Sequence, residues 1–239
     1  MAAGDVELLF RDDAYLPECE ARVSAVHPDG VELDRTVFYY ESGGQPGDVG
    51  ALVLGDGRVL AVTDTRRGPT PGSVVHRCAP PADLAPGTRL VARIDWERRH
   101  RLMRMHTALH LLSAVIVAPV TGGQVGDGYG RLDFDLPENI DPAAVERELN
   151  ALVGRDAPLV ARWVDDAELD AHPELVKTMS VQPPRGKGRV RLIEVAGIDL
   201  QPCGGTHVAR SGEVGALSIA KVEKKGSHNR RVRVELAGG

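Results

Sequence analysis

The chain has 239 residues, of which 42% are hydrophobic and 26% charged, and its formal net charge is −5. These proportions are typical of a globular protein with enough core for one large domain or two ordinary ones. The acidic balance disfavours a uniformly basic nucleic-acid-binding protein, and no apolar run approaches the roughly 20 residues of a membrane span. Three cysteines without disulfide spacing and the lack of a signal-peptide pattern predict a cytoplasmic location.

Residues 1–92 show short strand patterns separated by turns, without helical periodicity over a useful length. The sequence Gly55-Asp56-Gly57 between two apolar runs is typical of a hairpin turn. The expected strands are 19–26, 31–39, 51–54, 58–63, 73–77 and 88–94. A small β-barrel buries so many short strands without leaving open edges. We therefore expect an N-terminal β-barrel domain over residues 1–92.

After a Pro- and Ala-rich stretch at 80–87, the pattern predicts an α+β domain over residues 93–239. Asp95 can cap a helix over about 96–117, whose buried stripe would be Leu102, Met105, Leu109, Leu112 and Ile116. Asp141-Pro142 and Asp165 open two further helices. Strands are expected at 130–135, 158–164, 189–195, 216–222 and 231–236. This order suggests helices packed on one face of a mostly antiparallel sheet.

The 96–117 helix carries two histidines, His106 and His110, four residues apart and therefore on one face. Alone, such a pair is often no more than core or surface histidines. Cys203 and His207, in the glycine-bearing turn Cys-Gly-Gly-Thr-His, can converge on the same space. Three imidazoles and one thiolate are a zinc set by ligand type. Because Thr107 and Ala108 stand where an HExxH protease carries its glutamate, peptide hydrolysis by that route is disfavoured.

Two further features are distinctive. Ser42-Gly43-Gly44-Gln45-Pro46-Gly47-Asp48 has three glycines within five residues, which permit positive φ and close approach of a ligand, although an ordinary loop would also use glycine. Basic residues gather at two places, and the alternative to phosphate binding is a solvated surface. They are Arg98, Arg99, Arg101 and Arg104, and Lys221, Lys224, Lys225, Arg230, Arg231 and Arg233.

The motifs HTALH, CGGTH and SGGQPGD, with DWERRHRLMRMHTALHLL leading in and NRRVRVEL closing the chain, resemble the AlaX family in its medium-length class, AlaX-M. These proteins are free-standing relatives of the alanyl-tRNA synthetase editing domain. The resemblance implies a translation-factor-like β-barrel followed by the two-layer editing domain shared with threonyl-tRNA synthetase. It implies trans-editing hydrolysis of tRNA(Ala) mischarged with serine, with glycine left open, and one zinc ion held by His106, His110, Cys203 and His207.

Other roles carried over from the resemblance are less specific. Thr121 is the candidate for recognising the serine hydroxyl, with Gln124 nearly as good. The acceptor end of the tRNA would be held by Arg98, Arg99, Arg101, Arg104, Lys224, Lys225, Arg230 and Arg231. The glycine-rich loop of Ser42, Gly43, Gly44, Gln45 and Gly47 is expected to act as a lid.

Two questions remain open at this point. Four protein ligands are typical of a structural zinc, whereas a hydrolytic zinc keeps one position open, so the metal either positions substrate and water or orders the pocket.

The rival functions are a non-catalytic tRNA-binding module with a structural zinc and a broad zinc esterase. Aminoacylation is disfavoured because no ATP-binding synthetase core is recognisable. The sequence does not indicate an oligomeric state.

Overall fold

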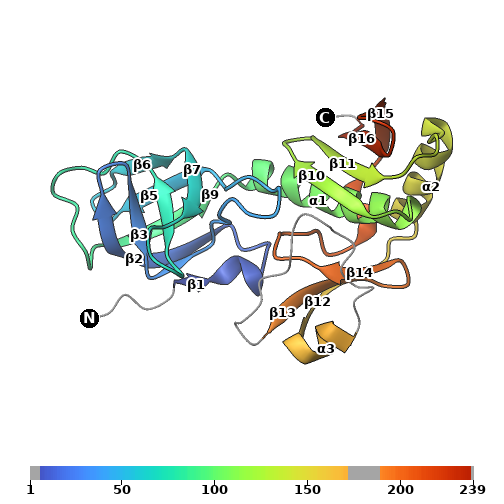
Figure 1. The fold of residues 1–239 in the computed structure, drawn as a ribbon. Coiled ribbons are helices and arrows are strands. Elements are labelled where there is room, and N and C mark those ends of the chain that lie inside the picture. Colours follow the sequence, from blue (N-terminus) through green and yellow to red (C-terminus); the bar gives the residue numbers. More distant parts are fainter. Residues whose placement is uncertain (1–5, 172–188, 238–239) are drawn as a thin grey trace. The chain divides into compact units, whose positions relative to one another are not determined.

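The computed structural model describes residues 6–171 and 189–237 (Figure 1). The chain divides into two compact units. The N-terminal unit comprises Met1–Ser42 and Pro46–His100, and the C-terminal unit comprises Gly43–Gln45 and Arg101–Gly239. Helix α1 (Trp96–Val115) runs through the division, so its first turn belongs to one unit and the remainder to the other.

The N-terminal unit contains a seven-stranded antiparallel sheet in the order β6-β5-β9-β2-β3-β8-β7. Its strands are β2 (Glu18–His27), β3 (Gly30–Leu33), β5 (Gly50–Leu54), β6 (Val59–Val62), β7 (Asp64–Arg67), β8 (Val74–Arg77) and β9 (Arg89–Ile94). A two-stranded parallel pair, β1 (Glu7–Leu8) and β4 (Arg35–Thr36), and the 3-10 helix η1 (Leu9–Arg11) complete the unit. The expected strands are confirmed except 31–39, which divides into β3 and β4 and ends at Thr36. β1 was missed, and so was β7, because Asp-Thr-Arg-Arg shows no apolar alternation.

The closed barrel expected for this unit is not confirmed. The ladder order ends at β6 and β7, and no ladder joins these two strands among the described residues. Only Thr63 separates β6 from β7, and the two strands pair with different neighbours, β5 and β8. The sheet instead packs around one cluster of buried apolar residues that includes Val31, Leu33, Phe38 and Leu52.

A fully buried ion pair lies at the start of α1. Arg99 is 0% exposed, and its Nε donates to Oδ1 and Oδ2 of Asp48 at 3.0 and 2.9 Å. Its other nitrogens donate to the carbonyl oxygens of Ala14 and Val37, and the backbone N–H of Tyr39 donates to Asp48 at 2.6 Å. Every charge in this cluster therefore has hydrogen-bonding partners, as burial requires. The pair ties the end of the glycine-rich stretch to the first turn of α1.

The C-terminal unit has an α+β fold with two antiparallel sheets, whereas the sequence predicts one. The first has the order β10-β11-β16-β15 and contains β10 (Val120–Val125), β11 (Tyr129–Asp135), β15 (Leu217–Lys224) and β16 (Asn229–Leu236). The second contains β12 (Leu159–Val164), β13 (Val190–Val195) and β14 (Asp199–Pro202). Helices α2 (Pro142–Gly154) and α3 (Asp166–Ala171) and the 3-10 helix η3 (Ser211–Val214) complete the unit.

Local signals account for the helices. Asp95 accepts a hydrogen bond from the N–H of Arg98 at 3.0 Å, and the whole predicted stripe of α1 is buried. Asp141 caps α2 through the N–H of Ala143. Two side chains of α2, Glu146 and Asn150, accept hydrogen bonds from backbone N–H groups of β15. Because β15 is an edge strand of its sheet, these bonds occupy backbone donors that would otherwise be open to another strand.

No helix in the described ranges is both long enough and apolar enough to cross a membrane.

Candidate metal centre

Four side chains from distant parts of the C-terminal unit converge at one point. The ligand atoms of His106, His110, Cys203 and His207 all lie within 4.8 Å of one another. Sγ of Cys203 lies 3.4 Å from Nε2 of His106 and 3.2 Å from Nε2 of His207. The two histidines of α1 share a face as their spacing predicted, and the turn after β14 brings the other two residues to them.

Each of the three imidazoles has an oxygen atom beside its outer nitrogen. Nδ1 of His106 lies 2.8 Å from Oε1 of Gln45, and Nδ1 of His207 lies 3.1 Å from Oγ1 of Thr107. Nδ1 of His110 lies 3.3 Å from Oδ2 of Asp199, within ion-pair range although off the direction of a normal hydrogen bond. Partners of this kind fix the ring orientation of metal-binding histidines and leave Nε2 free to coordinate.

The turn that carries Cys203 is held from β13 and packed against the histidines. Nη1 of Arg191 donates to the carbonyl oxygens of Cys203 and Gly205 at 3.0 and 2.9 Å. A Cβ atom at Gly205 would lie 2.2 Å from Cε1 of His106, so only glycine fits there without displacement of the ring. The glycines of the motif thus serve a close approach of backbone to imidazole.

The electrostatics of the cluster favour a thiolate. Burial alone would raise the pKa of Cys203, but His106 and His207 outweigh burial and hold that pKa well below its usual range. Burial and the neighbouring His106 lower the pKa of His207 to about 3. Burial alone would lower the pKa of His110, but Asp199 and Cys203 raise it to about 9. Thiolate and neutral imidazole are the forms that bind a metal, and a cation would replace the proton on His110.

The segment Gly43–Gln45 of the glycine-rich stretch lies at this centre. Gln45 is 0% exposed and contacts both His106 and Thr206. Gly44 accepts a hydrogen bond from the N–H of Val125 at 2.8 Å, so the segment also runs beside β10. A lid was expected for Ser42, Gly43, Gly44, Gln45 and Gly47. Gln45 is anchored among the cluster side chains, and closure of the loop as a lid stays a prediction.

The two candidates for substrate recognition, Thr121 and Gln124, both lie on β10. The hydroxyl of Thr121 donates to the carbonyl oxygen of Asp133 at 3.1 Å and accepts from Nδ2 of Asn229 at 2.8 Å. Gln124 is exposed, and its Oε1 accepts from Nε of Arg131 at 3.3 Å. Among the contacts of the described residues, none joins Thr121 to the four-residue cluster. Gln124 directly precedes Val125, which binds the glycine-rich segment.

Two of the expected tRNA-binding residues are buried, which corrects the sequence-based expectation for them. Arg99 is fully enclosed with Asp48. Arg230 is 4% exposed, and its guanidinium donates to backbone carbonyls of Pro137, Glu138, Gly226, Ser227 and Asn229. Neither guanidinium can reach a phosphate in this conformation.

The other expected contacts are half-buried or exposed, and several are paired. Arg98 and Arg104 donate to the carbonyl oxygens of Gly47 and Val214. Arg101 pairs with Asp127, and Arg231 with Asp133. Lys224 and Lys225 are exposed.

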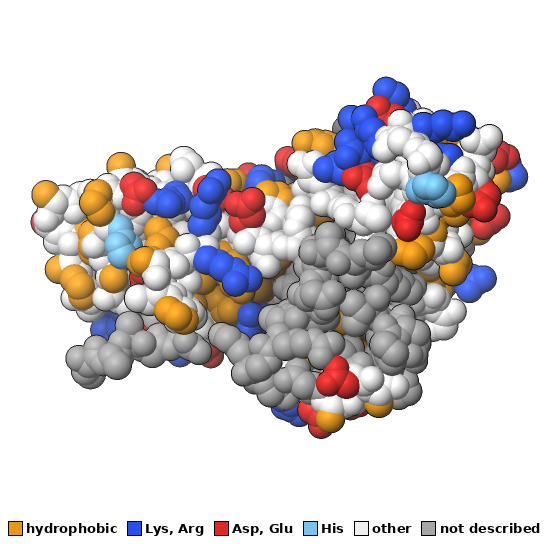
Figure 2. All heavy atoms as spheres, viewed as in Figure 1, with side chains coloured by type: hydrophobic (Ala, Val, Ile, Leu, Met, Phe, Trp, Pro, Cys, Tyr) orange, Lys and Arg blue, Asp and Glu red, His pale blue; other side chains and the backbone are white. Residues whose placement is uncertain are grey.

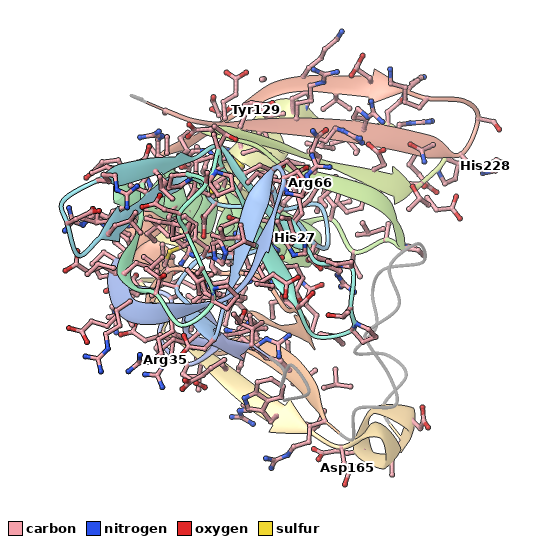
Figure 3. All side chains as sticks on the ribbon, turned by 90° about the vertical axis from the view of Figure 1, so that its left-hand side faces the viewer. His27, Arg35, Arg66, Tyr129, Asp165 and His228 are labelled. Carbon is pink, nitrogen blue, oxygen red and sulfur yellow. The ribbon has the colours of Figure 1, made fainter. Side chains whose placement is uncertain are left out.

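Basic side chains gather on the β15–β16 hairpin, with acidic ones among them (Figure 2). Glu223 lies between Lys221, Lys225 and Arg233, and hydrogen bonding from Lys221 helps to lower its pKa to about 2. The turn of this hairpin projects from the unit and carries His228 (Figure 3). Among the expected tRNA contacts, Lys224 and Lys225 of this hairpin are the exposed ones.

Sequence reasoning missed the residues that orient the cluster: Gln45 in this role, Thr107, Asp199 and Arg191. They are spread over four segments, and no spacing rule connects them. The one available signal was the polar residue within the glycine-rich motif, which was interpreted as part of a lid.

Comparison with known proteins agrees with this geometry. The family model for the "Threonyl and Alanyl tRNA synthetase second additional domain" matches residues 190–233, which include Cys203 and His207. The model for "tRNA synthetases class II (A)" matches residues 6–98. The alanyl-tRNA editing protein AlaX-M of Saccharolobus solfataricus is 33% identical over 230 residues, covering 95% of this chain and 97% of the relative.

The chain belongs to the AlaX-M family of alanyl-tRNA editing proteins. The AlaX-M protein of Methanosarcina acetivorans is 38% identical over 244 residues, covering 96% of this chain and 98% of that protein. The alanine–tRNA ligase of Methanothermobacter thermautotrophicus is 34% identical over 228 residues, which are 91% of this chain and 25% of the ligase. The AlaX-M family resemblance expected from the motifs is thereby confirmed.

Proposed function

We propose that this protein deacylates mischarged tRNA(Ala) in trans, with serine as the misplaced amino acid and zinc as the metal. The observation that carries the proposal is the convergence of His106, His110, Cys203 and His207 in a member of the AlaX-M family. Residues 93–239 would form the editing domain and residues 1–92 the accessory domain. The cytoplasm, where tRNA is charged, is the expected location.

The donor set fits a zinc ion. Three imidazole nitrogens and a thiolate are common zinc ligands, and the low pKa of Cys203 supplies the charged sulfur. A bound zinc would supply a positive charge able to polarise a carbonyl oxygen or to lower the pKa of a water. Gln45, Thr107 and Asp199 hold the imidazole rings, so the four ligands need little rearrangement on binding.

Discrimination would depend on a polar group beside the site. Serine differs from alanine by one hydroxyl, and a site that hydrogen-bonds a hydroxyl rejects an analogue lacking it, because its own polar group would be left unpaired. Of the two candidates, Gln124 is favoured. Its side chain is exposed, and its neighbour Val125 is bonded to the segment that carries Gln45. The hydroxyl of Thr121 is already engaged with Asp133 and Asn229.

The acceptor end of the tRNA would be held through its phosphates. Lys221, Lys224, Lys225 and Arg233 of the β15–β16 hairpin are exposed and supply the charge, and Lys221, Lys225 and Arg233 also pair with Glu223. Arg98, Arg101, Arg104 and Arg231 would contribute only after exchange of their present partners. Binding of this kind is sensitive to salt and largely independent of base sequence.

A second candidate is a tRNA-binding module without catalysis. It is favoured by one observation: four protein side chains surround the centre, and four ligands are typical of a structural zinc. In that function the metal would only order the turn at Cys203–His207.

One assay separates these functions. The protein is incubated with Ser-tRNA(Ala), Gly-tRNA(Ala) and Ala-tRNA(Ala), with and without a zinc chelator, and release of the amino acid is measured. We expect rapid loss of serine, little loss of alanine, and recovery of activity when zinc is returned after chelation. Binding of all three tRNAs without release would establish the module, and hydrolysis of simple esters independent of tRNA would establish a broad esterase.

A further inference from the structure

The side chain of Gln45 makes three polar contacts while fully enclosed. Its Oε1 lies 2.8 Å from Nδ1 of His106 and accepts from the backbone N–H of Thr206 at 3.2 Å. Its Nε2 donates to Oγ1 of Thr206 at 2.8 Å. Oε1 of an amide can only accept, so the contact with His106 requires a proton on Nδ1 of that ring.

The backbone before Gln45 is shaped to deliver this side chain. Gly43 and Gly44 have φ angles of 57° and 85°, in the left-handed region that favours glycine. A Cβ at Gly44 would lie 2.9 Å from the carbonyl oxygen of Gly123. Gly43–Gln45 therefore groups with the C-terminal unit, although the residues on either side belong to the N-terminal one.

We propose that Gln45 is a positioning residue of the metal centre. It holds the His106 imidazole with Nδ1 protonated and Nε2 directed toward Sγ of Cys203, and it ties that ring to the Cys203–His207 turn through Thr206. This inference rests on the proposed metal site and extends it to the glycine-rich segment. The segment Gly43–Gln45 is then part of the metal centre. The contacts of Gln45 with His106 and Thr206 fix the conformation of this segment as well as the position of the ligands.

The geometry distinguishes this role from simple packing. An apolar side chain of the same size would leave two buried donors, Nδ1–H of His106 and the N–H of Thr206, without an acceptor. Gly205 lies close to both the His106 ring and the Gln45 amide. A Cβ atom at Gly205 would lie 2.2 Å from Cε1 of His106 and 2.9 Å from Oε1 of Gln45, so glycine at this position leaves room for both side chains.

The test compares Gln45→Met, which keeps the size and removes the acceptor, with Gln45→Glu, which keeps an acceptor for both N–H groups. Zinc affinity is measured by competition with a chromophoric chelator, and the ligand field is followed through the visible spectrum of the Co²⁺-substituted protein. Glu148→Met serves as the control, because Glu148 is an exposed residue of α2 and has no part in the proposed metal or tRNA sites.

We expect Gln45→Met to weaken zinc binding about 10- to 100-fold and to alter the Co²⁺ spectrum, as loss of an outer-shell partner typically does. Gln45→Glu should restore zinc affinity to near the wild-type value, and Glu148→Met should leave the affinity at the wild-type value. Wild-type affinity and spectrum in Gln45→Met would overturn the inference while leaving the metal site intact. Failure of the wild-type protein to bind zinc or Co²⁺ would instead overturn the proposed metal centre.

A further variant keeps the test decisive if Gln45→Met does not fold. Thr206→Val removes only the hydroxyl that accepts from Nε2 of Gln45 and leaves all four ligands in place. A measurably weaker zinc affinity in this variant supports the positioning role. Unchanged affinity, in a protein whose circular dichroism matches the wild type, would contradict it.

Discussion

Gly205 lies against the imidazole ring of His106 so closely that a Cβ atom there would be 2.2 Å from Cε1. Its neighbour Gly204 has open space where its own Cβ atom would lie, with no atom of the described residues within 4 Å. The two adjacent glycines of the Cys-Gly-Gly-Thr-His turn therefore differ in their structural role. One allows backbone and ring to approach each other, and the other lies where a side chain would fit.

This difference predicts that an added methyl group weakens zinc binding at Gly205 but not at Gly204. Gly205→Ala should displace the His106 ring and weaken zinc binding at least about tenfold, the lower end of the effect of losing an orienting partner. Gly204→Ala should bind zinc as the wild type does. Zinc stoichiometry after dialysis against a weak chelator compares the two variants directly. Equal retention of zinc in both would show that the turn does not need the close approach.

The buried pair of Asp48 and Arg99 predicts a large effect on stability. Arg99→Met leaves the carboxylate of Asp48 buried without its partner, and such a loss typically costs about 3–5 kcal/mol in the free energy of unfolding. Arg58→Met is the matched control, because the ion pair of Arg58 with Asp83 is exposed and should contribute little. Urea denaturation measures both. The double variant Asp48→Asn/Arg99→Met should recover part of the loss, and failure to recover any would argue against an unpaired charge as its cause.

His76 predicts how the stability of the N-terminal unit depends on pH. The ring is fully buried, with Nε2 2.7 Å from Oγ1 of Thr36 and Nδ1 3.1 Å from the carbonyl oxygen of Val31. Burial lowers its pKa to about 4, against about 6.5 in an unfolded chain. Between these values the unfolded chain binds more protons, so stability falls as the pH falls from about 6.5 to about 4, by up to about 3 kcal/mol.

The measurement is the free energy of unfolding at several pH values across that window. His76→Gln should show a shallower decrease, because the proton uptake linked to this ring is removed. His228→Gln, at the exposed turn of the β15–β16 hairpin, controls for the removal of one imidazole. A slope in His76→Gln identical to that of the wild type would assign the acid sensitivity to other groups.

The exposed lysines of the hairpin predict the salt dependence of tRNA binding. Lys224→Ala/Lys225→Ala should weaken binding of all tRNAs and lower the slope of log affinity against log salt by about one per lysine. Arg230→Lys is an informative contrast, because the guanidinium of Arg230 is occupied by backbone carbonyls. It should affect stability and not the salt slope. An unchanged slope in the double lysine variant would place the binding surface elsewhere.

Much of the local structure was predictable from the residues alone. The stripe of α1, the cap at Asp141 and the strands with alternating apolar residues are encoded within a few consecutive positions, so local pattern is sufficient. β10 and β14 were missed because their sequences lack such a local pattern. The sequence Val-Thr-Gly-Gly-Gln-Val shows no alternation, and the pairing of such a strand depends on a neighbour far along the chain.

The sequence by itself determined the four candidate ligands, because two short motifs with metal-ligand spacing are legible without any fold. Only the tertiary structure decided what orients them: Gln45, Thr107 and Asp199 reach the three rings from separate segments. It also decided that Arg99 and Arg230 are internal, although their neighbours in sequence look like a basic surface. The physical reason is that spacing sets the face of a helix, whereas burial and hydrogen-bond partners are set by whichever distant segment packs there.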